Sequence, residues 1–221
     1  MIRGMIFDLD GTLIDSMGVW EQIDIDFLGK RGLSVPPGYL EAITPMGFLN
    51  AAEYTISRFG FSETPEEIEE EWLSMAEDAY THVIAMKPGA KDFLHQCRAT
   101  GLQLALATSS MERLYVPCLR HHEIDSLFEA AVSTRQAGKD KHDPDIYLMA
   151  AGQLGLKPEE CIVFEDILLG IETAKKAGFQ TAAVYEQTSE AHQEAMRERA
   201  DFYIESFENV SLSDFIHTKA K

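Results

Sequence analysis

Residues 5–12 read Met5-Ile6-Phe7-Asp8-Leu9-Asp10-Gly11-Thr12, an apolar run followed at once by two carboxylates two positions apart. The apolar run is typical of a buried β-strand, and the glycine and threonine after the carboxylates favour a tight turn. Parallel sheets bind their ligands at the carboxyl ends of the strands. We therefore expect Asp8 and Asp10 at a binding edge, because a purely structural role as turn caps accounts for only one of them.

Further short apolar runs, rich in β-branched or aromatic residues, are predicted to be strands. They are Leu102 to Ala107, Ala130 to Val132, Ile162 to Phe164, Ala182 to Val184 and the shorter Tyr203-Ile204. From residue 102 onward, helical stretches separate these runs, at 111–121, 145–154, 167–177 and 190–199. This is the rhythm of a parallel sheet covered by helices on both faces. It predicts an α/β fold, a Rossmann-like doubly wound parallel sheet.

The long stretch between the first two strands breaks this rhythm and is predicted to be helical throughout. The expected helices are 17–31, 48–59 and 65–84. The last of them begins Thr64-Pro65-Glu66-Glu67, in which Thr64 and Glu67 form a capping box and Pro65 suits the first helical turn. An all-helical insert is the simplest interpretation of this pattern.

The borders of the insert are marked by helix breakers, Gly18 at one end and Pro88-Gly89 at the other. We expect an α/β core formed by residues 1–15 and 88–221, with residues 16–87 as an inserted helical domain. The alternative is one domain with extra helices packed tightly on it.

The composition excludes several classes of protein. The chain has 37 acidic and 19 basic residues, a net charge of −18, which disfavours nucleic acid or an anionic membrane surface as a partner. Its N-terminus meets Arg3 and Asp8 too early for a signal peptide or a membrane-spanning helix. The cysteines, Cys97, Cys118 and Cys161, lack zinc-site spacing and are expected to be buried thiols. We expect a cytoplasmic protein, with a monomer as the default.

Three segments, in chain order, resemble signature motifs of the haloacid dehalogenase superfamily, whose phosphatases form an aspartyl-phosphate on the first aspartate. Asp8-Leu9-Asp10-Gly11-Thr12 is similar to the first motif, DxDGT. Thr108-Ser109-Ser110, after the strand at 102–107, resembles the second motif, in which a hydroxyl and neighbouring amides bind the phosphoryl oxygens. Ile162-Val163-Phe164-Glu165-Asp166, followed by Gly170 to Ala174, resembles the fourth, a strand that ends in an acidic pair before a helix.

The segment from Gly138 to Tyr147 resembles the third motif, written GKPxPxxF or Y. Lys141 has the position of the motif lysine by its distance from Pro144, although His142 replaces the first proline. Lys139 is a second candidate for the same cation. A lysine suits this role because its compact charge neutralises both a phosphate and a carboxylate.

The resemblance implies phosphate-ester hydrolysis supported by Mg²⁺, a hard cation that prefers oxygen ligands. Asp8 is the implied nucleophile, Lys141 the neutralising cation, and Asp10 the acid that protonates the leaving oxygen and then the base that activates water. The implied metal ligands are Asp8, Asp166, the backbone carbonyl of Asp10 and, as an auxiliary ligand, Glu165. The implied phosphate-binding residues are Gly11, Thr12, Thr108 and Ser109.

A helical insert directly after the first motif is similar to the branch that includes beta-phosphoglucomutase and many small-molecule phosphatases. There the insert caps the site and selects the substrate, so Trp20 and the turn at 44–50 are expected to face the cleft. Trp20 stands where beta-phosphoglucomutase has a histidine, and that turn lacks the basic residues that hold a second phosphate. A phosphatase of a small phosphate ester is favoured. A sugar-phosphate mutase, in which Lys87 supplies the second cation, and a catalytically silent binding protein are the alternatives.

Overall fold

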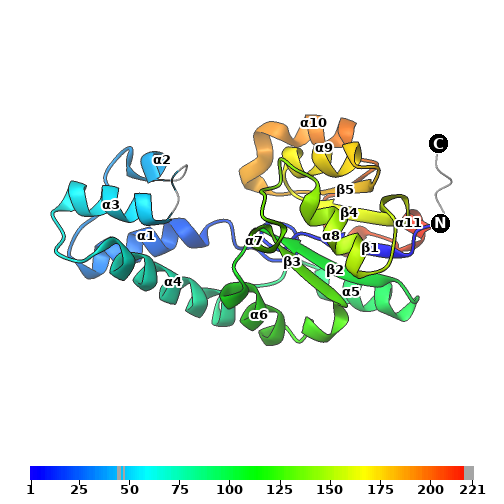
Figure 1. The fold of residues 1–221 in the computed structure, drawn as a ribbon, viewed down its shortest axis with the longest axis horizontal. Coiled ribbons are helices and arrows are strands. Elements are labelled where there is room, and N and C mark those ends of the chain that lie inside the picture. The colour runs from blue at the N-terminus through cyan, green and yellow to red at the C-terminus, as the bar shows by residue number, and fades with distance from the viewer. Residues whose placement is uncertain (44–45, 47, 217–221) are drawn as a thin grey trace. The chain divides into compact units, whose positions relative to one another are not determined.

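The chain divides into two compact units in a computed structural model that describes residues 1–43, 46 and 48–216 (Figure 1). One unit comprises Met1–Met17 and Ile84–Lys221, and the other comprises Gly18–Val83. The boundaries expected from the sequence, residues 16 and 87, lie close to these divisions. None of the helices within the described ranges has the length and apolarity needed to cross a bilayer.

The larger unit contains a six-stranded sheet in which every neighbouring pair of strands is parallel. The strands are β1 (Gly4–Phe7), β2 (Gln103–Thr108), β3 (Ala130–Ser133), β4 (Cys161–Glu165), β5 (Gln180–Val184) and β6 (Phe202–Ile204). Their order, β3-β2-β1-β4-β5-β6, is that of a doubly wound sheet, in which the winding direction reverses between β1 and β4. The predicted α/β fold is confirmed, and the reversal identifies the edge where such sheets bind ligands.

Helices cover both faces of this sheet (Figure 1). They are α5 (Ala90–Ala99), α6 (Glu112–His121), α7 (Thr134–Ala137), α8 (Asp145–Gln153), α9 (Leu168–Lys176), α10 (Gln193–Arg199) and α11 (Ser213–Ile216). The four helices predicted after residue 102 are confirmed as α6, α8, α9 and α10. The sequence pattern did not predict α5, α7 or α11.

Alternate residues of the central strands face opposite sides of the sheet, and both sides are buried. Ile6 and Val163 belong to an apolar cluster that includes Tyr147 of α8 and Ala174 of α9. On the other face the rings of Phe7 and Phe164 stack with centroids 4.4 Å apart. Because apolar residues fill both faces, the strands are continuous apolar runs, and the first polar side chains occur where the strands end.

The smaller unit is helical. It contains α1 (Val19–Lys30), α2 (Tyr39–Ile43), α3 (Phe48–Phe59) and α4 (Pro65–His82), with α4 packed against both α1 and α3. The predicted capping box is confirmed, since the Glu67 amide donates to the Thr64 hydroxyl and the Thr64 amide donates to the Glu67 carboxylate. The short helix α2 was not predicted. Thr44, Pro45 and Gly47, in the turn expected to face the cleft, lie outside the described residues.

Candidate active site

The first and fourth motifs meet at the carboxyl ends of two neighbouring strands. Phe7 of β1 pairs with Phe164 of β4, so the next residues lie side by side: Asp8 directly after β1 and Glu165 at the last position of β4. Asp166 follows directly. Carboxylate oxygens from Asp8, Glu165 and Asp166 all lie within 4.8 Å of one another, and all three side chains are buried.

Among the residues that the structure describes, one lysine ammonium lies against this carboxylate cluster. The Nζ atom of Lys141 is 2.7 Å from Asp8 Oδ1 and 2.7 Å from Glu165 Oε1, and the residue is only 6% exposed. The other candidate, Lys139, is half exposed, and its Nζ atom lies 3.3 Å from Asp145 Oδ2 and 3.6 Å from Asp143 Oδ1. The structure therefore brings Lys141, and not Lys139, to the motif carboxylates.

Burial and mutual repulsion change the protonation behaviour of these groups. Burial, followed by the charge of Glu165, raises the pKa of Asp166 to about 7. Burial likewise raises the pKa of Asp8 well above its usual range, against the opposing effect of the Lys141 charge. For Lys141, burial lowers the pKa, but the charges of Asp8 and Glu165 outweigh it, so the pKa is raised and the ammonium keeps its proton. The cluster holds more negative charge than one lysine neutralises.

Two further residues hold Glu165 in place, and the sequence pattern gave neither a role in the site. The hydroxyl of Tyr147, which is fully buried on α8, donates to Glu165 Oε1 at 2.7 Å. Gly170 lies so close to this carboxyl that a Cβ atom there would be 2.6 Å from Glu165 Cδ. Both residues belong to the motifs quoted from the sequence, but the motifs do not predict that either residue contacts Glu165.

Gly11 and Thr12 hold Asp166. Gly11 has φ +76°, and a Cβ atom at this position would lie 2.4 Å from Asp166 Oδ2. The Thr12 hydroxyl donates to Asp166 Oδ1 at 2.9 Å. The backbone amides of these two residues donate within the turn, that of Gly11 to the Ile14 carbonyl and that of Thr12 to the Leu9 carbonyl. Gly11 and Thr12 therefore position the carboxylate of Asp166.

Asp10 is held by two serine hydroxyls from different parts of the chain. Ser16 Oγ donates to Asp10 Oδ1 at 2.7 Å, and Ser110 Oγ donates to Asp10 Oδ2 at 2.5 Å. Of the second motif, Thr108 is fully buried and its hydroxyl accepts from the Ser110 amide at 3.0 Å, whereas Ser109 is exposed. The contacts of Ser16 and Ser110 with Asp10 were not predicted from the sequence.

The carboxylate cluster has the chemistry of a divalent-cation site. All its ligand atoms are oxygens, which Mg²⁺ prefers. Glu165 Oε2 is buried and has no hydrogen-bond partner among the described residues, although buried carboxylate oxygens are normally paired. Three carboxylates face one ammonium, so a divalent cation would neutralise the excess charge. The residues fit a metal ion, and its ligands would be Asp8, Glu165 and Asp166.

In the helical unit, Trp20 is half-buried, and its ring centroid lies 5.3 Å from that of Phe48. Two of the basic side chains near the insert are paired with carboxylates. Arg31 pairs with Glu71 at 2.6 Å. In the α/β unit, Lys87 Nζ lies 2.6 Å from Glu186 Oε2 and donates to the Tyr185 carbonyl.

Comparison with known proteins agrees with this geometry. The chain is 32% identical over 185 residues to hexitol phosphatase A of Escherichia coli, with 82% of each chain covered. It is 29% identical over 221 residues to a Drosophila melanogaster protein named "probable pseudouridine-5'-phosphatase", with 95% of each covered. CbbY from Rhodobacter sphaeroides, solved in complex with phosphate, has the same fold, with a TM-score of 0.75, 22% identity and coverage of 95% of this chain and 96% of that one.

Residues 5–184 match the haloacid dehalogenase-like hydrolase family, a range that begins in β1 and ends with β5 and so includes every motif described above. The chain therefore belongs to the haloacid dehalogenase-like hydrolase family, and within it the chain is a phosphatase.

Proposed function

We propose that the chain is a Mg²⁺-dependent phosphomonoester hydrolase that acts on a small phosphorylated metabolite through an aspartyl-phosphate on Asp8. The observation that carries this proposal is the contact of the buried Lys141 ammonium with Asp8 and Glu165, at the edge where the sheet reverses. Relatives named for the phosphate esters of a hexitol and a nucleoside support a small organic substrate.

In the first half-reaction, a carboxylate oxygen of Asp8 attacks phosphorus while the bond between phosphorus and the ester oxygen breaks. Asp10 donates a proton to the departing oxygen, which leaves as an alcohol. Lys141 holds Asp8 by one oxygen, Oδ1, and neutralises charge beside the phosphoryl group. Ser16 and Ser110 fix the carboxyl of Asp10 for the transfer.

In the second half-reaction, Asp10 takes a proton from water as the water oxygen attacks the phosphorus of the aspartyl-phosphate. The bond between phosphorus and Asp8 breaks, inorganic phosphate leaves, and the Asp8 carboxylate is restored. Asp8, Glu165, Asp166 and the backbone carbonyl of Asp10 would hold Mg²⁺, which supplies charge neutralisation at the phosphoryl oxygens. Tyr147 and Thr12 orient Glu165 and Asp166 for this role.

We further propose that residues 16–87 act as the cap that selects the substrate, with Trp20 among its contacts. Hydrolysis is favoured over a mutase reaction because a bisphosphate intermediate needs a cation for its second phosphate. Arg31 and Lys87 are both paired with carboxylates, and Trp20 replaces the histidine of the mutase.

The test is phosphate release from an aryl phosphate and from a panel of sugar and nucleotide phosphates, with and without Mg²⁺. We expect release that requires Mg²⁺ and disappears in Asp8→Asn. If the intact protein with Mg²⁺ releases nothing, or if Asp8→Asn keeps its activity, the proposal is wrong. Interconversion of hexose phosphates with a bisphosphate primer would then distinguish a mutase from a silent binding protein.

A further inference from the structure

The helical unit contains a cavity of about 400 Å³, and the residues described as lining it all belong to that unit. Its walls are mostly apolar and carry three aromatic rings, those of Trp20 on α1, Phe48 on α3 and Trp72 on α4. The rings of Trp20 and Phe48 lie with their centroids 5.3 Å apart and their planes inclined at 57°. This volume is in the range of small-molecule sites in proteins. The cavity can therefore hold a small ligand with groups of the helical unit alone.

One carboxylate, that of Asp24, lines this mostly apolar cavity. The described lining contains no lysine, arginine or histidine, so none of its side chains neutralises the carboxylate. Burial raises the pKa of Asp24 to about 6, and the negative charge of the nearby Glu21 adds to this effect. Asp24 is therefore mostly ionised at neutral pH, and its negative charge favours a cationic ligand over a neutral or an anionic one.

The aromatic rings favour a ligand with the same sign of charge. The face of an aromatic ring is negative and attracts a cation that lies within about 6 Å of the ring centroid, and tryptophan does so most strongly. Two of the three rings that line the cavity are tryptophans. Several ring faces around one cavity are the arrangement by which proteins bind organic ammonium groups. The carboxylate and the rings thus indicate a cation independently of each other.

The kind of cation follows from the small number of oxygen atoms in the wall. A metal ion such as Ca²⁺ takes about six to eight oxygen ligands, whereas Asp24 is the one described lining residue with a side-chain oxygen. A primary ammonium has three N–H donors, and the apolar wall would leave some of them without an acceptor. A quaternary ammonium has no N–H donor, and its methyl groups suit aliphatic neighbours such as Ile23 and Ile43. The cavity therefore favours a quaternary ammonium group.

A buried donor in the wall limits the rest of the ligand. Trp72 is 4% exposed, and its Nε1 atom has no hydrogen-bond partner among the described residues. A buried N–H without an acceptor costs free energy that a ligand oxygen would recover. The ligand then carries one uncharged oxygen acceptor besides its ammonium group. Choline combines these two groups in a small molecule.

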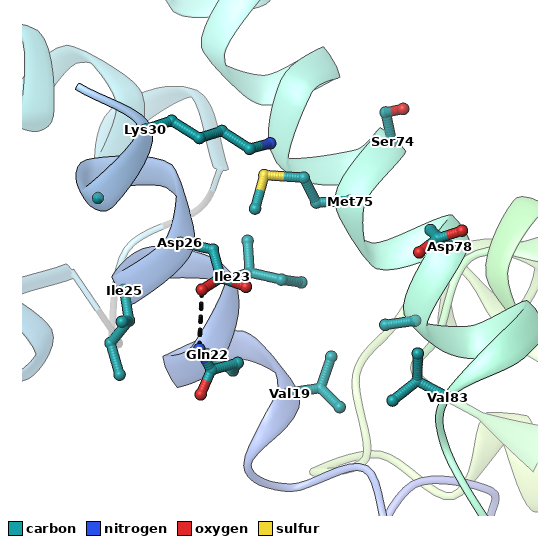
Figure 2. Close-up of a pocket in the computed structure, with 12 residues that line it drawn as sticks. Val19, Gln22, Ile23, Ile25, Asp26, Lys30, Ser74, Met75, Asp78 and Val83 are labelled. Carbon is teal, nitrogen blue, oxygen red and sulfur yellow. Dashed lines mark hydrogen bonds between the residues drawn. The ribbon is translucent and has the colours of Figure 1, made fainter. Parts of the chain in front are cut away.

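A second hollow of the helical unit, of about 780 Å³ between α1 and α4, lacks this combination (Figure 2). Its described lining includes the carboxylates of Asp26 and Asp78 but no aromatic residue. Lys30 supplies a cation there, and the side chain of Gln22 donates to Asp26 at 2.9 Å. Asp78 is exposed to water and provides a matched control for Asp24.

We propose that the cavity between the three aromatic rings and Asp24 binds a quaternary ammonium compound that carries an oxygen acceptor, of the choline class. The ammonium group lies against the rings with Asp24 as its counter-ion, and Trp72 Nε1 donates to the ligand oxygen. The site belongs to the helical unit and does not depend on the proposed phosphatase function.

The test is a titration of the full chain with choline, without substrate or Mg²⁺, followed by tryptophan fluorescence and by calorimetry. The only two tryptophans of the chain, Trp20 and Trp72, both line the cavity, so the fluorescence reports on it directly. The matched neutral ligand is 3,3-dimethyl-1-butanol, in which a carbon atom replaces the nitrogen of choline while the hydroxyl and the shape are kept. We expect saturable binding of choline that is about 10-fold tighter than binding of the neutral alcohol. Ethanolamine, the primary ammonium, should also bind more weakly than choline.

Asp24→Asn should weaken choline binding by about 10-fold and leave binding of the neutral alcohol unchanged. Trp72→Phe keeps an aromatic ring but removes the N–H, and it should weaken choline binding by about 3- to 10-fold. Asp78→Asn should match the wild type. Equal affinities for choline and the neutral alcohol, equal choline affinities in wild type and Asp24→Asn, or no saturable choline binding by the folded wild-type chain would each overturn the inference. Phosphate release from an aryl phosphate is measured separately, so failure of either proposal leaves the other standing.

Discussion

The two units of this chain differ in how many charged groups they gather at their candidate sites. In the α/β unit, the charged groups of the candidate active site contact one another: Lys141 contacts Asp8 and Glu165, and Thr12 donates to Asp166, while Glu165 Oε2 has no partner among the described residues. In the helical unit, the cavity at Trp20 is mostly apolar, and the buried Trp72 Nε1 atom has no hydrogen-bond partner among the described residues.

We infer from this difference that the α/β unit carries out the reaction and that the helical unit selects the substrate. A phosphoryl transfer needs charges fixed in advance, so its groups are held by neighbours before substrate arrives. Selection needs groups that only the correct ligand satisfies, since an incorrect ligand then leaves them unpaired. Substitutions in the α/β unit should therefore affect every substrate, and substitutions around the cavity should affect particular substrates.

Asp10→Asn should lower kcat by about 10²- to 10⁴-fold for every phosphate ester, because it removes the proton donor of one half-reaction and the base of the other. Mg²⁺ binding should persist, since the implied ligand from this residue is its backbone carbonyl. Steady-state kinetics and a Mg²⁺ titration by calorimetry measure the two effects. An unchanged turnover would show that Asp10 is not the acid and base.

Lys141→Ala should lower kcat by about 10²- to 10³-fold, the usual effect of losing one fixed electrostatic donor. It should also destabilise the α/β unit by about 3–5 kcal/mol, because the buried carboxylates lose their cation. Lys139→Ala is the matched control, and its half-exposed side chain predicts wild-type kinetics and unfolding. If Lys139→Ala had the larger effect on kcat, the assignment of the motif lysine would be reversed.

Tyr147→Phe should raise the Mg²⁺ concentration for half-maximal activity by about 10-fold, because it removes the hydroxyl that orients Glu165. The lost hydrogen bond should also lower the free energy of unfolding by about 1–3 kcal/mol. Mg²⁺-dependent kinetics and chemical denaturation measure the two quantities. A variant that loses stability but keeps its Mg²⁺ dependence would limit Tyr147 to a packing role.

Asp24→Asn should stabilise the helical unit at neutral pH and have no effect near pH 3.5. The pKa in the folded state, about 6, lies above the ordinary 3.8, so the unfolded chain loses its proton first as the pH rises. The folded state therefore loses relative stability between about pH 4 and pH 6, and the loss is complete above that range. Urea unfolding followed by tryptophan fluorescence reports this unit, since it contains Trp20 and Trp72. An equal shift at both pH values would contradict the buried-charge explanation.

Much of the reaction site could be predicted from the sequence because its residues follow strand ends at fixed spacings. The apolar run of β1, which is buried on both faces, predicts that Asp8 lies at the end of that strand, and the run of β4 predicts the same for Glu165 and Asp166. The contacts that hold these groups could not be predicted. Ser110 lies a hundred positions from Asp10, and nothing in either local pattern indicates that they meet.

Helix α2 and the cavity of the helical unit could not be predicted from the sequence, for physical reasons. Helix α2 is five residues long and too short for a clear apolar period. The cavity could not be predicted because Trp20, Ile23 and Trp72 are residue types that usually fill cores, and the sequence does not say whether they leave space between them. Asp24 looked like any other acid on α1 until its apolar surroundings were known.

The most direct test of the central claim is acid quenching of the wild-type protein during turnover of an aryl phosphate with Mg²⁺, followed by peptide mass spectrometry. We expect one added phosphoryl group, carried by Asp8 and absent from Asp8→Asn. Turnover with no phosphoryl group on the protein, or with the group on another residue, would contradict it.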